Sequence, residues 1–205
     1  MSLIVVGTMA FDAIETPFVK SDRIIGGAAT YIALSASNFV KPIQQISVVG
    51  GDFPQAELDH LSKLGVQLDG VQIKKDEKSF FWAGRYHMDM NERDTLDTQL
   101  NVLANFTPVV PDSYQDAEFL MLGNLVPAVQ MSVLNQMKKK PKLVVMDTMN
   151  FWMETAMADL EEVLKKVDVL LVNDSEARQL SGQYSLVKAA KTIMGMGPKY
   201  LVVKK

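Results

Sequence analysis

Short apolar runs alternate with segments of helical periodicity along most of the chain, and this alternation constrains the fold more than any other feature. Leu3–Val6 is a continuous apolar run, as is typical of a strand buried on both faces. Further strands are expected at 45–49, 119–122, 143–146, 169–172 and 200–203. Helices are expected at 28–40, 54–64, 128–137, 154–166, 175–180 and 186–194. Strands separated by helices of about ten residues favour right-handed βαβ units, so the sequence predicts an α/β fold with a mostly parallel sheet.

The middle of the chain has a different texture. Residues 66–73 alternate apolar and polar side chains, and residues 79–88 are rich in aromatic side chains, as expected of strands. Residues 90–105 are polar with weak periodicity and are expected to be a loop, as are residues 7–12. This section is therefore predicted to form a small β appendage rather than part of the parallel sheet.

Composition and missing motifs exclude several classes of protein. The 205 residues carry a formal net charge of −3, so there is no basic surface of the kind that binds nucleic acid or an anionic membrane. They include no cysteine, so there is no disulfide framework. No apolar run approaches a membrane span, and the N-terminus lacks the features of a signal peptide, so a soluble cytoplasmic protein is expected. P-loop, dinucleotide-binding and nucleophile-elbow motifs are absent. His60 and His87 lack metal-ligand spacing.

Gly26 and Gly27 open a stretch of small residues, Ala28 to Ser37. A helix that begins after this pair would direct free N–H groups and the positive end of its dipole at a ligand. The alternative is a loop followed by a well-packed core helix, and the stretch alone leaves both interpretations open.

Polar side chains follow several of the expected strands at their carboxyl ends. They are Asp12, Asp52, Asn124, Asp147, Asn150, Asn173 and Glu176. The loops after parallel strands share one sheet edge, where ligands bind. Residues 173–176 also resemble a helix capping box, which is the structural alternative for that motif. The convergence of five loops is more informative than any one of them.

A series of motifs occurs in order along the chain. It comprises Gly7 with Asp12, Gly26-Gly27, Val49-Gly50-Gly51-Asp52, Leu64-Gly65-Val66, Asp147-Thr148-Met149-Asn150 and Asn173-Asp174-Ser175-Glu176-Ala177. The series resembles the ribokinase (PfkB) family of ATP-dependent carbohydrate and nucleoside kinases. The resemblance implies a three-layer αβα ribokinase-like fold with a mostly parallel central sheet and a small β lid. The core would comprise residues 1–12, 26–65 and 106–205, and the lid residues 13–25 and 66–105.

The resemblance also implies a reaction, ATP- and Mg²⁺-dependent phosphorylation of a hydroxymethyl group on a sugar or nucleoside. Its implied substrate-binding residues are Asp12, Gly26, Gly27, Tyr31, Asn124 and Asn150. Asn173 and Glu176 would help organise the nucleotide phosphates and Mg²⁺, with Glu176 acting on the metal indirectly. The aromatic run 80–82 suits a cover over the substrate, or a plain hydrophobic strand face, and the lid is a possible homodimer contact.

Two departures from the family pattern stand out. Tyr31 occupies the position of a sugar-binding asparagine in ribokinase itself, which argues against ribose as the substrate. The catalytic Gly-Ala-Gly-Asp motif, which carries the general base and the anion hole, does not occur in residues 1–205. We therefore expect no catalytic base in this chain, a C-terminal continuation that holds the motif, and no kinase activity from these 205 residues alone. The alternatives are a non-catalytic sugar-binding or interaction module with the same fold and, less favoured, an unrelated doubly wound nucleotide-binding domain.

Overall fold

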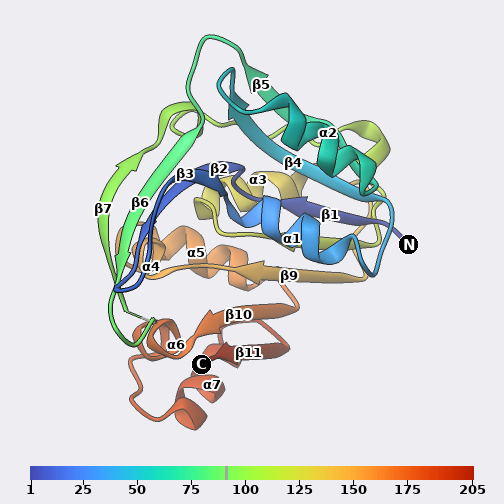
Figure 1. Cartoon of the computed structure of the whole chain (residues 1–205). Helices are drawn as coiled ribbons and strands as arrows, with labels where there is room; N and C mark the ends of the chain where they lie inside the picture. The colour runs from blue at the N-terminus through green and yellow to red at the C-terminus, as the bar shows by residue number, and fades with distance from the viewer. Residues whose placement is uncertain (91) are drawn as a thin grey trace. The chain divides into compact units, whose positions relative to one another are not determined.

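The computed structural model describes residues 1–90 and 92–205 of the chain (Figure 1). The chain divides into two compact units, one of residues Met1–Val6 and Pro108–Lys205, the other of Gly7–Thr107. Each unit is described by itself below.

The first unit contains five parallel strands in the order β11-β10-β9-β8-β1. Their bounds are β1 Leu3–Val6, β8 Phe119–Leu122, β9 Leu143–Asp147, β10 Val169–Asn173 and β11 Tyr200–Lys204. Each strand coincides with an apolar run within one or two residues. Ile4, Leu120 and Met146 are fully buried, which explains why these runs show little polar alternation.

Helices connect these strands, as expected, with one correction. They are α3 Pro127–Gln136, α4 Asn150–Thr155, α5 Met157–Leu164, α6 Asp174–Ser181 and α7 Leu186–Met194, with a 3₁₀ turn, η2, at Asp112–Tyr114. The single helix expected at 154–166 is wrong, because Ala156 leaves the helical region at φ −144° and separates α4 from α5. The predicted apolar stripe lies on α5, where Leu160 and Val163 are fully buried.

The second unit contains a parallel pair of strands, β4 (Ile43–Gly50) and β5 (Val66–Lys74), joined through α2 (Gln55–Lys63). Helix α1 (Ala28–Ala36) also packs on β4. Residues 66–74 fall within the range expected for the lid, but they pair in parallel with β4, a strand of the expected core. The side chains of β5 range from buried to exposed, and this mixture produced the misleading alternation.

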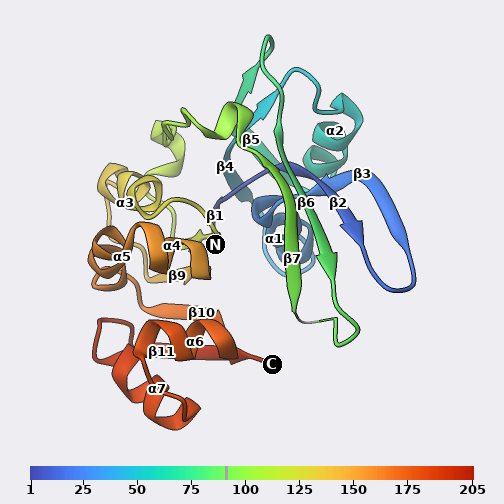
Figure 2. The ribbon, with the colours of Figure 1, turned by 90° about the vertical axis from the view of Figure 1, so that its left-hand side faces the viewer.

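Four further strands form a separate sheet in the order β3-β2-β6-β7 (Figure 2). They are β2 Ala10–Glu15, β3 Lys20–Gly26, β6 Phe80–Tyr86 and β7 Arg93–Gln99, and a 3₁₀ turn, η1, follows at Asn101–Leu103. The loops expected at 7–12 and 90–105 are thus wrong in part, because β2 begins inside the first and β7 lies inside the second. Residue 91 of the second lies outside the described residues. Strand β2 pairs antiparallel with β3 but parallel with β6, and β6 pairs antiparallel with β7.

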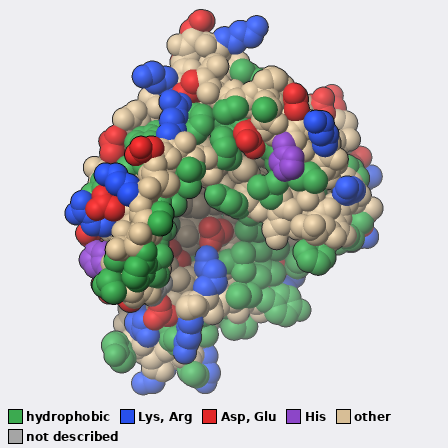
Figure 3. All heavy atoms as spheres, viewed as in Figure 1, with side chains coloured by type: hydrophobic (Ala, Val, Ile, Leu, Met, Phe, Trp, Pro, Cys, Tyr) green, Lys and Arg blue, Asp and Glu red, His purple; other side chains and the backbone are tan. Residues whose placement is uncertain are grey.

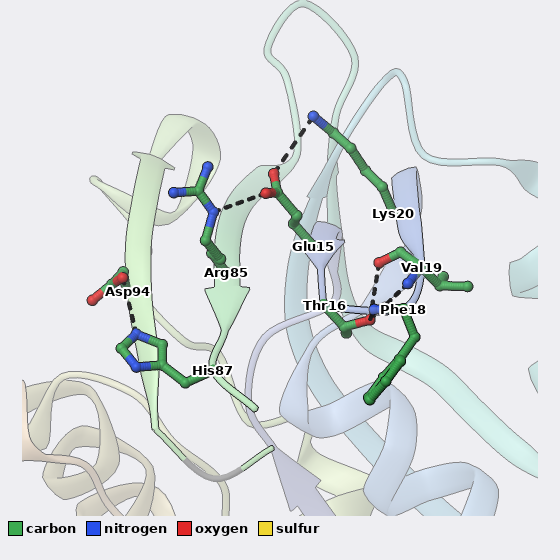
Figure 4. Close-up of polar contacts among 8 residues, drawn as sticks. All are labelled: Glu15, Thr16, Phe18, Val19, Lys20, Arg85, His87 and Asp94. Atoms are coloured by element: carbon green, nitrogen blue, oxygen red, sulfur yellow. Dashed lines mark hydrogen bonds and ion pairs between the residues drawn. The ribbon is translucent and has the colours of Figure 1, made fainter. Parts of the chain in front are cut away.

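A row of alternating charges crosses this sheet at one end (Figure 4). Lys20, Glu15, Arg85 and Asp94 are successive cross-strand partners from β3 to β7. Glu15 lies 2.8 Å from the Arg85 guanidinium and 3.6 Å from the Lys20 ammonium. The hydrogen bond from Arg85 is the main reason why the pKa of Glu15 is lowered. His87 adds a contact of 3.0 Å to Asp94.

The surface chemistry agrees with the small net charge. On the face drawn in Figure 3, Lys and Arg side chains are interspersed with Asp and Glu. Within residues 1–90 and 92–205, no helix combines the length and apolar character needed to cross a bilayer.

Candidate functional site

The eight candidate site residues fall equally into the two units. Asp12, Gly26, Gly27 and Tyr31 belong to the unit of residues 7–107. Asn124, Asn150, Asn173 and Glu176 belong to the other unit.

Asp12 and Gly26 lie against each other on neighbouring strands. Asp12 is on β2 and Gly26 is a buried residue at the end of β3. A Cβ atom at Gly26 would lie 2.8 Å from Asp12 Oδ1 and would overlap the rest of the carboxylate. Glycine at this position therefore makes the room that the Asp12 side chain occupies.

The Asp12 carboxylate makes no hydrogen bond or ion pair with any residue that the structure describes. Burial alone raises its pKa to about 6. Burying an ionised carboxylate costs free energy unless a partner donates hydrogen bonds to it. The Asp12 carboxylate is therefore a strong candidate for accepting hydrogen bonds from a ligand.

Gly27 is required by its backbone conformation. Its φ of 95° lies in the region that favours glycine, and a side chain there would overlap the Thr8 carbonyl group. It precedes α1, whose first two N–H groups, of Ala28 and Ala29, donate to Thr8 Oγ1 at 3.1 Å and Thr8 O at 2.9 Å. Those donors are thus used internally, which favours the interpretation of this stretch as a well-packed helix start.

Tyr31 lies on α1, and its hydroxyl donates to Ile25 O at 3.0 Å. The residue is 55% exposed, so its ring covers little of the core. The contact fixes the phenol beside the end of β3, close in sequence to Gly26.

Two aromatic residues share the sheet face of Asp12. In the parallel pairing of β2 with β6, Asp12 is opposite Trp82 and Ala10 is opposite Phe80, and opposed residues point to the same face. Trp82 lies over Gly84, where a Cβ would overlap its indole ring, and its Nε1 donates to Thr95 Oγ1 at 3.3 Å. The indole is therefore held over Gly84, on the same sheet face as Asp12.

Asp52, which also follows a strand, has structural partners instead of a free carboxylate. It pairs with the Arg23 guanidinium and accepts hydrogen bonds of 2.8 Å from both Ser79 N and Ser79 Oγ. Burial opposes its ionisation, but these bonds outweigh burial and hold the pKa of Asp52 below its ordinary value. No pattern in the sequence indicates Ser79, which is buried and also accepts a hydrogen bond from Gly50 N.

In the other unit, Asn124 connects the loops that follow β8 and β9. Its Oδ1 accepts from Trp152 Nε1 at 2.7 Å, and its Nδ2 donates to Met149 Sδ at 3.1 Å. Asn150, at the start of α4, donates to Gln179 Oε1 of α6. The edge where β8, β9 and β10 end is thus linked by side-chain amides.

Asp147 lies at the same edge, at the end of β9. Burial raises its pKa even though Lys204 Nζ lies 3.3 Å from its Oδ1. Lys204 is the cross-strand partner of Asn173, so a carboxylate, a cation and an amide meet where β9, β10 and β11 end.

Asn173 and Glu176 form the capping box of α6. Asn173 Oδ1 accepts from Glu176 N, and Glu176 Oε2 accepts from Asn173 N, each at 2.7 Å. The structural alternative for this motif is therefore confirmed. Because these oxygens are engaged and Glu176 is only 4% exposed, the pair fits Mg²⁺ held through water better than direct ligation. Among the described residues, no group of three or more His, Cys, Asp or Glu side chains could enclose a metal ion.

Parallel strands with connecting helices, a separate four-stranded sheet and polar residues after the strands define an α/β protein whose candidate ligand-binding residues follow its strands. Residues 5–205 match the model of the pfkB family carbohydrate kinases, and the chain belongs to this family. A cytidine kinase of Thermococcus kodakarensis is 26% identical over 206 residues, which cover 99% of this chain and 72% of the relative. The family membership makes the protein a phosphotransferase that acts on a sugar or nucleoside.

Solved structures agree with the fold. The fructokinase of Halothermothrix orenii superimposes with a TM-score of 0.77 at 18% identity, over 100% of this chain and 80% of that one. A nucleoside kinase of Burkholderia thailandensis, solved in complex with inosine, gives 0.74 at 17% identity, over 99% and 70%. The predicted ribokinase-like α/β fold with a small second sheet is thereby confirmed.

Proposed function

We propose that this kinase phosphorylates the hydroxymethyl group of a nucleoside, with ATP as the donor and Mg²⁺ as the metal. The observation that carries the proposal is the unpartnered Asp12 carboxylate beside Gly26. An ionised carboxylate without a protein partner can accept hydrogen bonds from sugar hydroxyls. Such charge-assisted hydrogen bonds are stronger than those between neutral groups. Gly26 and Gly27 keep the neighbouring backbone free of side chains, so that the sugar can approach it closely.

Three observations favour a nucleoside over a simple sugar. Trp82 and Phe80 share the face of Asp12, and an aromatic side chain offers a stacking surface to a nucleobase. Tyr31 replaces the asparagine by which ribokinase would hold its sugar. Relatives named cytidine kinase and nucleoside kinase cover nearly the whole chain.

The remaining candidate residues keep their expected roles as part of this proposal. Asn124 and Asn150 would bind the acceptor, and Asn173 and Glu176 would orient water molecules around the nucleotide-bound metal. Bound Mg²⁺ would neutralise charge on the transferring phosphoryl group. The general base belongs to a motif that does not occur in residues 1–205.

We further propose that the second sheet serves as the lid and as a homodimer contact. Phe18 and Val19, at the β2–β3 turn, are 73% and 65% exposed, and Thr16 fixes this turn by hydrogen bonds to Val19 and Phe18 (Figure 4). Light scattering at micromolar concentration tests the dimer, and a monomeric mass would reject it. The expected cytoplasmic location can be tested by cell fractionation.

The deciding experiment is phosphate transfer from ATP by the full-length gene product to a panel of nucleosides and sugars. We expect turnover with at least one nucleoside, loss of turnover on Mg²⁺ chelation, and weaker activity with free sugars. Transfer to sugars alone would reject the nucleoside acceptor. Nucleoside binding without transfer to any acceptor would favour the non-catalytic module instead.

A further inference from the structure

Gln130 on α3 joins the two strand ends that carry Asn124 and Asn150. It is fully buried, and its Nε2 donates to Gly123 O at 2.9 Å and to Asp147 O at 3.2 Å. Gly123 directly precedes Asn124, and Asp147 ends β9 and precedes the short loop that leads to Asn150. One side-chain amide thus holds both loops from beneath.

The Gln130 contact lies just beyond the end of the pairing between β8 and β9. The pairing of β8 with β9 ends at Leu122 opposite Met146, and the next carbonyl groups along each strand are those of Gly123 and Asp147. The two N–H groups of the Gln130 amide bond one carbonyl each, where the ladder between the strands has stopped. Gln130 therefore links the two chains just beyond the last residues that pair with each other.

A second link lies further along the same loops. Trp152 Nε1 donates to Asn124 Oδ1 at 2.7 Å, and Asn124 Nδ2 donates to Met149 Sδ. These contacts require the loops after β8 and β9 to keep a fixed spacing. Since Asn124 is bonded to the loop after β9, a change in spacing would reorient its amide.

The buried Gln130 amide uses its donor side but not its acceptor side. Gln130 Oε1 is buried without a hydrogen-bond partner among the described residues. A buried polar atom left without a partner carries a desolvation cost, which offsets part of the gain from the two bonds. An apolar side chain of similar size would avoid that cost but would leave the Gly123 and Asp147 carbonyl groups without this donor. The distinctive contribution of Gln130 is therefore that one side chain holds both carbonyl groups.

We propose that Gln130 is a positioning residue that sets the spacing between the acceptor-binding loops of Asn124 and Asn150. The proposal rests on the proposed function for its kinetic consequence, but its geometric consequence can be measured without any acceptor. Gln130 touches no reacting group and acts through the two loops.

The test compares Gln130→Met with Gln136→Met. Gln136 lies on the same helix and also bonds the backbone, at Pro108 O, Ser132 O and Val110 N, away from the two loops. Both variants lose amide hydrogen bonds, so both should lower the thermal midpoint. Only Gln130→Met should raise the KM for the acceptor, by about 10-fold with less than about 3-fold change in kcat.

A second readout follows the loop geometry directly. The full-length protein is labelled with 5-fluorotryptophan, and the ¹⁹F resonance of Trp152 is assigned as the one lost in Trp152→Phe. We expect this resonance to move or broaden in Gln130→Met and to stay in place in Gln136→Met. If Gln130→Met does not fold, Gln130→Asn, whose amide is one methylene too short to reach both carbonyls, is expected to give the same result.

The two readouts separate the proposals. If no acceptor is ever turned over, the proposed function fails, while a displaced Trp152 resonance still supports the spacing role. An unmoved Trp152 resonance, or equal effects of the Gln130 and Gln136 variants on KM, would overturn the role of Gln130.

Discussion

The Asp12 carboxylate occupies the space that a side chain at Gly26 would need. Any Cβ at Gly26 would overlap that carboxylate, so the residue types at these two positions depend on each other. The Gly-Gly motif is thus explained at its first position by an acidic neighbour and at its second by a positive φ.

The substitution Gly26→Ala should displace the Asp12 side chain. We expect the acceptor KM to rise by at least about 10-fold and stability to fall by about 1–3 kcal/mol, the usual cost of overpacking. Steady-state kinetics and thermal unfolding measure the two effects. Gly182→Ala is the matched control, because Gly182 has a φ of 65° with open space around it. It should lose stability with an unchanged KM, and a similar rise in KM in both variants would contradict the role of Gly26.

Asp12→Asn should weaken acceptor binding while stabilising the fold at neutral pH. The folded pKa of Asp12 is about 6, against 3.8 for an unperturbed group, so the folded state retains a proton that the unfolded state has lost. Stability contributed by Asp12 is therefore highest below about pH 4 and falls as the pH rises to about 6. We expect Asp12→Asn to melt about 2–4 °C higher than the native protein at pH 8, with no difference at pH 4. A lower melting temperature at pH 8 would contradict this pKa shift.

Trp82→Leu should separate nucleosides from sugars. Loss of one base-stacking surface costs about 1–3 kcal/mol, so the KM for a nucleoside should rise about 10-fold while that for a free sugar stays the same. Phe39→Leu, an 85% exposed aromatic residue outside the second sheet, is the control. Equal effects of Trp82→Leu on both acceptor classes would remove the argument for a base at this face.

Substitutions of Asn173 can separate its capping role from a role with the nucleotide. Asn173→Ala removes the cap of α6 and should cost about 1 kcal/mol, whereas Asn173→Ser keeps an acceptor for Glu176 N and should cost little. If the amide also orients the metal-bound nucleotide, both variants should bind Mg·ATP more weakly. Calorimetric titration beside thermal unfolding measures this, and unchanged affinity in Asn173→Ser would leave the cap as the sole role.

Ser79→Ala should destabilise the fold and alter its response to acid. It leaves Gly50 N without its acceptor and removes one hydrogen bond to Asp52, at a cost of about 1–3 kcal/mol. Because the pKa of Asp52 is lowered in the folded state, its contribution is present at neutral pH and lost as the pH falls below about 4. Thermal unfolding at pH 7 and pH 3 should therefore show a smaller difference in Ser79→Ala than in the native protein. The exposed Ser62→Ala should leave both values unchanged.

The sequence predicts best those elements that are buried on both faces, or whose residues interact with near neighbours along the chain. Strand β8 has the predicted bounds, because a short run of only apolar residues is typical of a strand buried on both faces. The capping box at 173–176 is readable because its partners are three residues apart.

The parts that the sequence could not predict depend on distant partners or lack a pattern. All seven residues of β7 are exposed, so this strand has no apolar alternation to reveal it. Strand β5 pairs in parallel with β4, but its sequence pattern does not distinguish a strand of the parallel sheet from a strand of an appendage. Asp52 resembled a site residue because its partners Arg23 and Ser79 lie 29 and 27 positions away.

The parallel pairing of β2 with β6 has a consequence for how the chain acquires its structure. Glu15 and Arg85 are 70 positions apart in sequence, and helices α1 and α2 and strands β4 and β5 lie between them. Closing so long a loop costs entropy that local contacts do not repay, so we expect this sheet to assemble late. During synthesis, the edge of β2 that pairs with β6 stays unpaired until residues 80–86 have left the ribosome. In that interval the exposed edge is open to a chaperone or to a second nascent chain.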